Sequence, residues 1–486
     1  MRKLLFMILI GAAAGFCGAS CAKKKIDAVI LITMESVSAA DLSANHSIYA
    51  TGDTTPVEQG TVFAPAVPED LDDLATLGVR FSNTFAPSGS AFASLVSIHT
   101  GKPPEESGVY CDLDRLNEAP TLAESLSLNG IHCGAFVARP SLTKGCGLER
   151  GFETYITKPR GARPGEGDAG SDARAWIELN RLLRPDQPIF CWIHLSMPRA
   201  PFEPRDEWLR RFSLVLEPGR ASIAALQKFT KKEMIYSAPE REVVHAYHAA
   251  AILQDAAIIA HFLSAARKTL NNFENTKIIF AGTNGEELGA RGPFGSRRTL
   301  RDATLHVPLY YFGPGTRALP RVSGSMIELQ DLTKTIADAL GCEPPHGSRG
   351  GDLLSLATDP NAKKRAVFSS WENRIFTVRT LRERLICNPA METPGGWPPG
   401  PLEIQREELY ELDHDPLELT NLSGKRLDRI EQLRGIAERE RTSRQWRAPV
   451  VETDPDRVKL LMQEGIHSGD GHPATPIPAA TSGSRM

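Results

Sequence analysis

Residues 28–33 read AVILIT, an unbroken apolar run rich in β-branched side chains. Such a run predicts a strand that is buried on both faces, which is typical of a parallel sheet. Comparable runs occupy residues 189–193 and 277–281. A fourth run, 307–312, contains Pro308, which indicates either an edge strand or the start of a strand. We therefore expect these four segments to be strands of a buried sheet.

Helical patterns separate these strands. They span residues 71–77, 121–129, 172–183, 241–270 and 327–340. Strands that alternate with helices predict an α/β fold, in which a mostly parallel sheet carries helices on both faces. Functional groups in such sheets gather at the carboxyl ends of the strands. The segments 34–36 and 282–284, which follow two of the predicted strands, are therefore the first places to look for a site.

The composition limits the classes of function. The chain has 486 residues, of which 41% are hydrophobic and 24% charged, as in ordinary globular proteins. Its 56 basic and 59 acidic residues give a net charge of -3, so no basic excess favours binding to nucleic acid. The length allows two or three domains, or one large domain with an appendage.

The pattern changes after residue 359. Short strands are predicted at 366–370, 375–380, 384–387 and 408–412, and a charged helix at 425–441. This pattern predicts a small antiparallel sheet plus a helix as a C-terminal subdomain. We place the domains at residues 26–360 and 361–450, followed by a tail, 451–486, that is disordered from about residue 468, where Pro, Gly, Ser and Thr dominate.

The N-terminus has the pattern of an export signal. Arg2 and Lys3 precede an apolar run, 4–16, and small residues lead to Cys21. The run is too short to span a bilayer easily. A Cys after small residues resembles a bacterial lipoprotein cleavage site, in which Cys21 becomes the lipidated N-terminus. We predict that residues 1–20 are a lipoprotein signal and that the mature chain is anchored in a bacterial membrane, facing the periplasm or the cell surface. The alternative is an ordinary signal peptide that is cleaved nearby.

Six cysteines remain beyond Cys21. An exported location permits disulfides, and Cys133 with Cys146 is the local pair that we expect. No Cys or His spacing indicates a zinc site or an iron–sulfur cluster.

A series of sequence stretches carries a family resemblance. Among them are VILITMES at 29–36, ASLVSIHTG at 93–101 and LYELDHDPLELTNL at 409–422. The others are 71–87, 121–124, 147–155, 194–202, 284–289 and 305–315. Together, in this order, they resemble the sulfatase family of the alkaline-phosphatase-like superfamily. The resemblance implies a doubly wound, mostly parallel sheet with the small C-terminal subdomain described above.

The resemblance also implies a chemistry, which this chain departs from. Family members hydrolyse sulfate esters with a formylglycine, made from Cys or Ser in a Cys/Ser-x-Pro-x-Arg motif, beside a calcium ion. Here the nucleophile position falls on Ala91, the proline on Ala93 and the arginine on Leu95. Ala91 has no heteroatom with which to attack. Ser90 or Ser94 could replace it only if the loop shifted, and the competing interpretation is that serines of this turn cap a helix.

The implied metal site is depleted in the same way. Where the family has an acidic pair, this chain has Glu35 and Ser36, and where the family has Asp-Asn or Asp-His, it has Thr283 and Asn284. Calcium prefers six to eight oxygen ligands, several of them from carboxylates. One carboxylate predicts a weak or empty site, so we expect no cofactor, or calcium if any metal is retained. The nearby 286–287 acidic pair is interpreted as the first turn of a helix.

Other residues of the implied pocket are also exchanged. In the stretch that resembles Asp-Pro-His-x-Pro-Tyr, the acid is Met197 and the histidine is Arg199. Arg297 and Arg298 follow the 294–295 segment, so Arg199, Arg297 and Arg298 could together bind a sulfate, phosphate or carboxylate. The alternative is a solvated basic loop. His194 keeps its place in the motif, either as an acid or base or as a structural residue.

Two functions follow from these patterns. The first is an exported sulfatase-like lipoprotein that is catalytically inactive and binds an anionic small molecule, a glycan or a protein partner. The second is an active metal-dependent hydrolase or transferase of sulfate or phosphate esters that uses a rearranged site. Loss of several members of a cooperative site removes nearly all specific rate enhancement. The sequence therefore favours the first function.

Overall fold

The structure is a computed structural model of the 486-residue chain. It describes residues 25–42, 78–200, 202–211, 238–288, 294–295, 299–371, 374–391, 405–464 and 466. The predicted signal peptide, Cys21, the predicted helix 71–77 and the tail from residue 468 lie outside the described residues.

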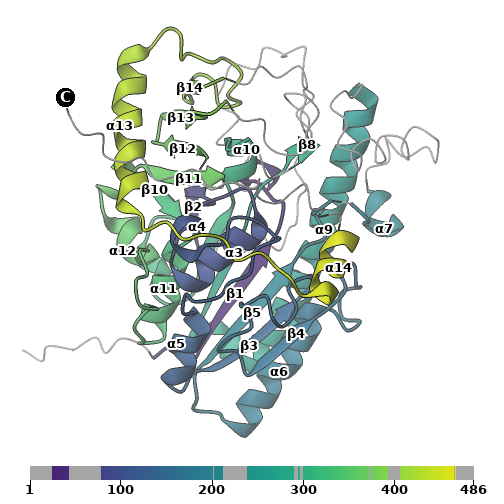
Figure 1. Cartoon of the computed structure of the whole chain (residues 1–486). Helices are drawn as coiled ribbons and strands as arrows, with labels where there is room; N and C mark the ends of the chain where they lie inside the picture. The colour runs from purple at the N-terminus through teal and green to yellow at the C-terminus, as the bar shows by residue number, and fades with distance from the viewer. Residues whose placement is uncertain are drawn as a thin grey trace, which may run out of the picture.

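An eight-stranded sheet forms the centre of the molecule (Figure 1). Its strand order is β10-β2-β9-β6-β1-β5-β3-β4, and only β9 runs antiparallel to its neighbours among the paired strands described. The strands are β1 (Ala28–Met34), β2 (Val79–Phe85), β3 (His132–Val137), β4 (Thr154–Thr157), β5 (Ile189–Leu195), β6 (Thr276–Gly282), β9 (Leu309–Phe312) and β10 (Val322–Glu328). The predicted mostly parallel sheet is confirmed.

Pro308 directly precedes β9, which lies between β2 and β6. Of the two interpretations of the 307–312 run, the strand start is therefore correct and the edge strand is wrong. A proline at this position removes no backbone donor from the ladder.

Helices cover both faces of the sheet, as the alternating pattern predicts. One face packs against α3 (Ala91–Thr100), α5 (Leu122–Leu128) and α11 (Asp331–Ala339), and the other against α6 (Ala169–Leu183) and α9 (Ala238–Thr269). Alternate residues of β1 supply the two cores, with Val29 and Leu31 on one side and Ile30 and Ile32 on the other. This arrangement explains why the run 28–33 is apolar throughout, because both faces of the strand are covered.

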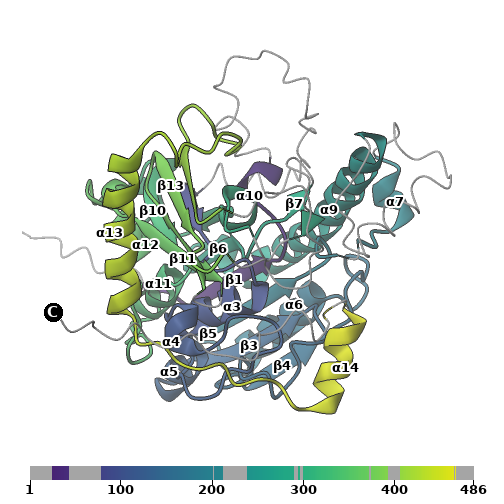
Figure 2. The same ribbon diagram turned by 45° about the horizontal axis from the view of Figure 1, so that its top comes forward.

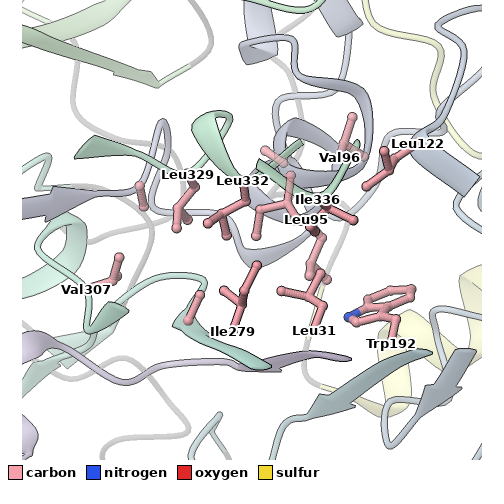
Figure 3. Close-up of a cluster of buried hydrophobic side chains, with 14 of the residues drawn as sticks. Leu31, Leu95, Val96, Leu122, Trp192, Ile279, Val307, Leu329, Leu332 and Ile336 are labelled. Atoms are coloured by element: carbon pink, nitrogen blue, oxygen red, sulfur yellow. The ribbon is translucent and has the colours of Figure 1, made fainter. Parts of the chain in front are cut away.

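Figure 3 shows the α3 side of this core. Side chains from the sheet point toward the covering helices, where both sets of residues are fully buried. The residues labelled there include Leu31, Trp192 and Ile279 from the strands and Leu95, Val96, Leu332 and Ile336 from the helices.

A smaller antiparallel sheet follows in the sequence. It has the order β11-β12-β13-β14 and consists of β11 (Val367–Trp371), β12 (Ile375–Arg379), β13 (Glu383–Cys387) and β14 (Glu407–Glu411). The helix α13 (Leu427–Ser443) packs against it through Ile430, Leu433 and Ala437. The predicted antiparallel sheet plus helix is confirmed, whereas the domain boundary at residues 360 and 361 stays a prediction.

Short elements complete the fold. The helices are α4 (Pro104–Ser107), α7 (Asp206–Leu209), α10 (Asp302–Leu305), α12 (Leu353–Thr358) and α14 (Pro455–Gln463), and β7 (Glu287–Leu288) pairs with β8 (Phe294–Gly295). The segment Val243–Thr269 within α9 is long and apolar enough to cross a membrane. Its apolar residues belong to the core beneath the sheet, which identifies it as a core helix.

Within the segment predicted as tail, 451–486, α14 begins after Asp454 with Pro455 at its first position. Two other predictions need correction. The acidic pair 286–287 does not open a helix, since Glu287 belongs to β7. Cys133 and Cys146 form no disulfide: both are free and buried, and the pKa of each thiol is raised by burial.

Candidate functional site

Several strands end together at one edge of the large sheet. Met34, the last residue of β1, is in register with Leu195 of β5 and with Gly282 of β6. The residues that follow these strands, including Glu35 and Thr283, therefore leave the sheet at the same place. β3 ends in register with His194, which brings Arg139, two residues beyond that strand, to the same edge.

Glu35 is the centre of a buried charged cluster. It is fully buried, and its Oε1 accepts hydrogen bonds from Arg139 Nη1 at 2.8 Å and from His194 Nε2 at 2.9 Å. Its Oε2 lies 3.5 Å from Arg199 Nε. Burial raises the pKa of Glu35, but Arg139, His194 and Arg199 outweigh it and lower the pKa to about 2. Glu35 is therefore a carboxylate held by cationic side chains.

Both ring nitrogens of His194 are engaged. Burial lowers its pKa, although Glu35 acts in the opposite direction. Nε2 donates a hydrogen bond to Glu35, which as a carboxylate can only accept, while Nδ1 lies 2.8 Å from Thr33 Oγ1. Thr33 Oγ1 in turn accepts a hydrogen bond from Trp192 Nε1 at 2.9 Å, so its own hydroxyl proton can go to Nδ1. The contacts of His194 are those of a structural residue that fixes Glu35.

The other three residues of the predicted metal site form a separate group. Asn284 Oδ1 accepts from the Ser36 backbone N–H at 3.2 Å and from Thr283 Oγ1 at 3.0 Å. Ser36 has a φ of 54°, a left-handed conformation that is uncommon for a residue with a side chain. His248 Nε2 donates to the Ser36 carbonyl at 2.7 Å and holds this turn in place. The structure thus brings Ser36, Thr283 and Asn284 together.

These residues do not fit calcium. Calcium needs several carboxylates to offset its charge and the loss of its water. The only carboxylate among the four positions is Glu35, whose Oε1 is taken by Arg139 and His194. The Asn284 oxygen already accepts two hydrogen bonds. Within the part of the chain that the structure describes, no three His, Cys, Asp or Glu side chains gather closely enough to hold a metal ion.

The nucleophile position lies in the first turn of α3. Ala91 is the first residue of this helix and is buried. Ser90 is the N-cap, and its Oγ accepts from the Ala93 backbone N–H at 3.4 Å. Ser94 Oγ donates to the Ser88 carbonyl at 3.2 Å. The hydroxyl groups of both fallback candidates therefore bond the local backbone, in agreement with the helix-capping interpretation.

Two more carboxylates contact Arg139, and sequence reasoning missed them. Arg139 is fully buried, donates to Asp112 Oδ1 at 2.6 Å through Nη2 and to Glu464 Oε2 at 3.0 Å through Nε. Arg199 Nη1 also donates to Glu464 Oε2, at 2.9 Å. Of the predicted arginine cluster, Arg199 thus lies in the site, whereas Arg297 and Arg298 lie outside the described residues.

A further buried acid lies beside this site on α9. Asp255 accepts the Met197 backbone N–H at 2.8 Å. Burial raises its pKa to about 7, against the opposing effects of that hydrogen bond and of Arg160. Met197 stands where the resembling motif carries an acid, so a carboxylate is still present near this position but comes from another element.

Several solved structures share this fold. A protein described in complex with its substrate D-glucosamine-2-N,6-O-disulfate superposes with a TM-score of 0.64 at 16% identity, over 86% of this chain and 98% of that chain. The phosphonate monoester hydrolase of Agrobacterium radiobacter gives a TM-score of 0.63 at 17% identity, over 88% of this chain and all of the other. The alkaline-phosphatase-like fold is therefore shared with these enzymes.

The sequence itself is related to one family. The family model Sulfatase matches residues 27–342. Arylsulfatase K of Rattus norvegicus is 27% identical over 207 residues, which is 40% of this chain and 33% of the relative. Choline-sulfatase of Rhizobium meliloti (strain 1021) is 26% identical over 207 residues, 41% of this chain and 38% of the relative. The matches thus span well under half the length of these relatives. The chain belongs to the sulfatase family.

Proposed function

We propose that this protein is an exported, lipid-anchored member of the sulfatase family that binds a sulfated or otherwise anionic glycan without hydrolysing it. Membership of the family makes sulfate esters the natural class of ligand. The separate question is whether the residues at the edge of the sheet support turnover or only binding.

The observation that carries the proposal is the pairing of Glu35 with Arg139. A guanidinium at 2.8 Å from the one carboxylate of the family's metal position already neutralises it. This pair is fully buried and held by His194 and Asp112 on either side. Glu35 Oε2 has no hydrogen-bond partner in the described structure, but a divalent cation there would face the guanidiniums of Arg139 and Arg199. Displacing Arg139 from the carboxylate would leave a buried arginine unpaired, at a cost of about 3–5 kcal/mol.

The first turn of α3 supports the same conclusion. Ala91 presents a methyl group where family members carry the nucleophile, and the hydroxyls of Ser90 and Ser94 bond the local backbone. Covalent catalysis needs an attacking oxygen that an adjacent base can deprotonate. Neither serine has such a base among its described hydrogen-bond partners.

The ligand class follows from the two arginines of the cluster. Arg139 and Arg199 provide two guanidinium groups with the fork geometry that suits sulfate, phosphate and carboxylate. A protein of the same fold, at 16% identity, is described with a disulfated glucosamine as its substrate. A sulfated sugar is therefore the first ligand to test.

Turnover and binding are tested separately. The purified mature protein is assayed on aryl sulfate and aryl phosphate esters with calcium, magnesium, manganese or zinc, and we expect no rate above that of heat-denatured protein. Calorimetric titration should detect D-glucosamine-2-N,6-O-disulfate and should not detect unsulfated glucosamine. Turnover that is lost in Ser90→Ala or Ser94→Ala would instead establish the active ester hydrolase.

The lipid anchor has its own test. Cys21→Ala should move the protein from the membrane fraction to the soluble exported fraction, whereas Cys17→Ala, which changes the other cysteine of the signal region, should leave it in the membrane. Membrane association that persists in Cys21→Ala would contradict lipidation at this residue.

A further inference from the structure

The C-terminal arm, residues 444–464, crosses the molecule and delivers a carboxylate to the site. In Figures 1 and 2 it runs from α13 past α4 to α14. Arg447 N–H donates to the Glu105 carbonyl in α4, and Val451 forms a β-bridge with Asp114. The arm ends in Glu464, directly after α14.

Four donors converge on the Glu464 carboxylate. Oε2 accepts from Arg139 Nε at 3.0 Å, from Arg199 Nη1 at 2.9 Å and from Ser141 Oγ at 2.6 Å. Oε1 accepts from the Ser141 backbone N–H at 2.8 Å. We name the groups that bind Glu464, which belong to Arg139, Ser141 and Arg199, the anion cradle. Two guanidiniums, a hydroxyl and an amide form a site that suits a sulfate, a phosphate or a carboxylate.

The residues of the cradle lie on the main body of the protein. Arg139 is held there by Glu35 and Asp112, and Arg199 also lies 3.5 Å from Glu35. Ser141 follows β3 by four residues. The donors therefore belong to the main body, whereas the acceptor arrives on a separate segment.

A buried arginine fixes the arm itself. Arg457, in α14, donates to the carbonyls of Ser141 and Asp114 at 3.0 Å each, and its guanidinium lies 5.0 Å from the centre of the Phe92 ring. Arg457 also pairs with Glu452 at 2.5 Å. These contacts place α14 beside Ser141, so the entry of Glu464 into the cradle is built into the docking of the helix.

Glu464 is ionised in this position. Burial raises the pKa of its carboxyl, but Arg139 and Arg199 outweigh burial, and the pKa lies below its usual value. With Glu464 present, two arginines face three carboxylates, those of Glu35, Asp112 and Glu464. Of these three acids, Glu464 is the one that the arm supplies, whereas Glu35 follows β1 and Asp112 lies in a turn of the main body.

We propose that Glu464 is an intramolecular occupant of the anion cradle and that an anionic ligand binds only when the C-terminal arm withdraws this carboxylate. The inference rests on the proposed function, since it assumes that the cradle is the anion-binding site. A site that is open for only a fraction of the time binds its ligand more weakly by that fraction. The arm therefore sets the affinity of the protein for its ligand.

The test compares four variants with the wild type in the full mature chain, with inorganic sulfate and D-glucosamine-2-N,6-O-disulfate as probes. Glu464→Ala should bind both probes at least about tenfold more tightly than the wild type, because no carboxylate competes. Glu464→Gln, which keeps the size of the side chain, should fall in between. Asp456→Asn removes an equal charge from an exposed position of the same helix and should leave the affinity unchanged. Arg199→Ala added to Glu464→Ala should remove the gain.

The results separate the two proposals. Equal affinity in the wild type and in Glu464→Ala would overturn the role of the arm and leave anion binding intact. Absence of binding in every variant would overturn both. Hydrogen exchange of the wild type gives a readout that needs no substitution: saturating disulfated glucosamine should speed exchange across residues 455–464, and unchanged protection of α14 in the bound state would overturn the displacement.

Discussion

The first turn of α3 and the cluster around Arg139 are two parts of one region that have changed in opposite ways. In the turn, the family's nucleophile position holds Ala91, and the neighbouring hydroxyls satisfy only the backbone. In the cluster, five charged side chains are buried together and pair with one another. The turn offers backbone hydrogen bonds and a methyl group, whereas the cluster gathers buried charges. Under the proposed function, the cluster recognises the charge of the ligand and the turn has no group that attacks an ester.

The largest effect should come from the cluster. Arg139→Met leaves Glu35 and Asp112 as buried carboxylates without their main partner, so we expect a loss of about 3–5 kcal/mol in the free energy of unfolding. Arg174→Met, which breaks the half-exposed pair with Glu178 on α6, should cost no more than about 0.5 kcal/mol. Urea denaturation at pH 7 measures both. A loss below about 1 kcal/mol for Arg139→Met would show that the cluster is not a stabilising unit.

The other end of α3 should control acid stability. His99 is fully buried among aromatic rings, including Trp192 at 4.3 Å between ring centres, and neither ring nitrogen has a hydrogen-bond partner in the described structure. Burial, with a smaller effect of His194, lowers its pKa to about 3. The unfolded chain therefore takes up a proton below pH 6.5 while the folded chain does not. The contribution of His99 to the free energy of unfolding is therefore fully present above pH 6.5 and is lost as the pH falls from 6.5 to 3.

At pH 5 this difference amounts to about 2 kcal/mol. His99→Leu keeps a similar volume and removes the titrating group. From pH 7.5 to pH 5, the free energy of unfolding should therefore decrease by about 2 kcal/mol less in His99→Leu than in the wild type. Urea midpoints at the two pH values measure the difference. Parallel curves for the wild type and His99→Leu would mean that His99 is protonated in the folded protein.

The long apolar runs made the central sheet predictable, and weaker strands escaped. β1, β5 and β6 are predicted from sequence because strands with both faces covered are made mostly of apolar residues. β3, with the sequence HCGAFV, and β10, with VSGSMIE, contain Gly, Ser or His. They are strands because neighbouring strands pair with them, which a single segment does not reveal.

The same limit explains which site residues were predicted. Glu35 and Thr283 follow recognisable strands, so the rule about strand ends finds them. Arg139 also follows a strand, but one whose pattern is weak. Glu464 lies 325 residues from Arg139 in the sequence and directly follows a short helix, beside a segment of tail-like composition. No local sequence pattern connects this glutamate with a distant arginine, and only the tertiary structure brings the two side chains together.

A smaller effect tests the turn itself. Ser90→Ala removes the N-cap of α3 and should cost about 1 kcal/mol of stability. Ser90→Gly should cost only a few tenths of a kcal/mol, since glycine is tolerated at this position. Thermal unfolding of the wild type and of the two variants measures this order of stabilities. Equal stability of Ser90→Ala and the wild type would remove the capping role and reopen the question of what this hydroxyl does.

The smallest expected effect is the response to calcium. A ligand that binds only the folded state at 100 times its Kd stabilises that state by about 2.7 kcal/mol. Glu35 already has arginine and histidine as partners, and Asn284 Oδ1 already accepts two hydrogen bonds. The melting temperature should therefore be the same in millimolar calcium as in EDTA. Magnesium at the same concentration controls for ionic strength. If calcium alone raises the melting temperature by several degrees, Glu35→Gln locates the ion. Loss of the rise in this variant would place calcium at the Glu35 position and show that Arg139 gives way to it, whereas persistence of the rise would place the ion elsewhere and leave the arginine as the cation of this site.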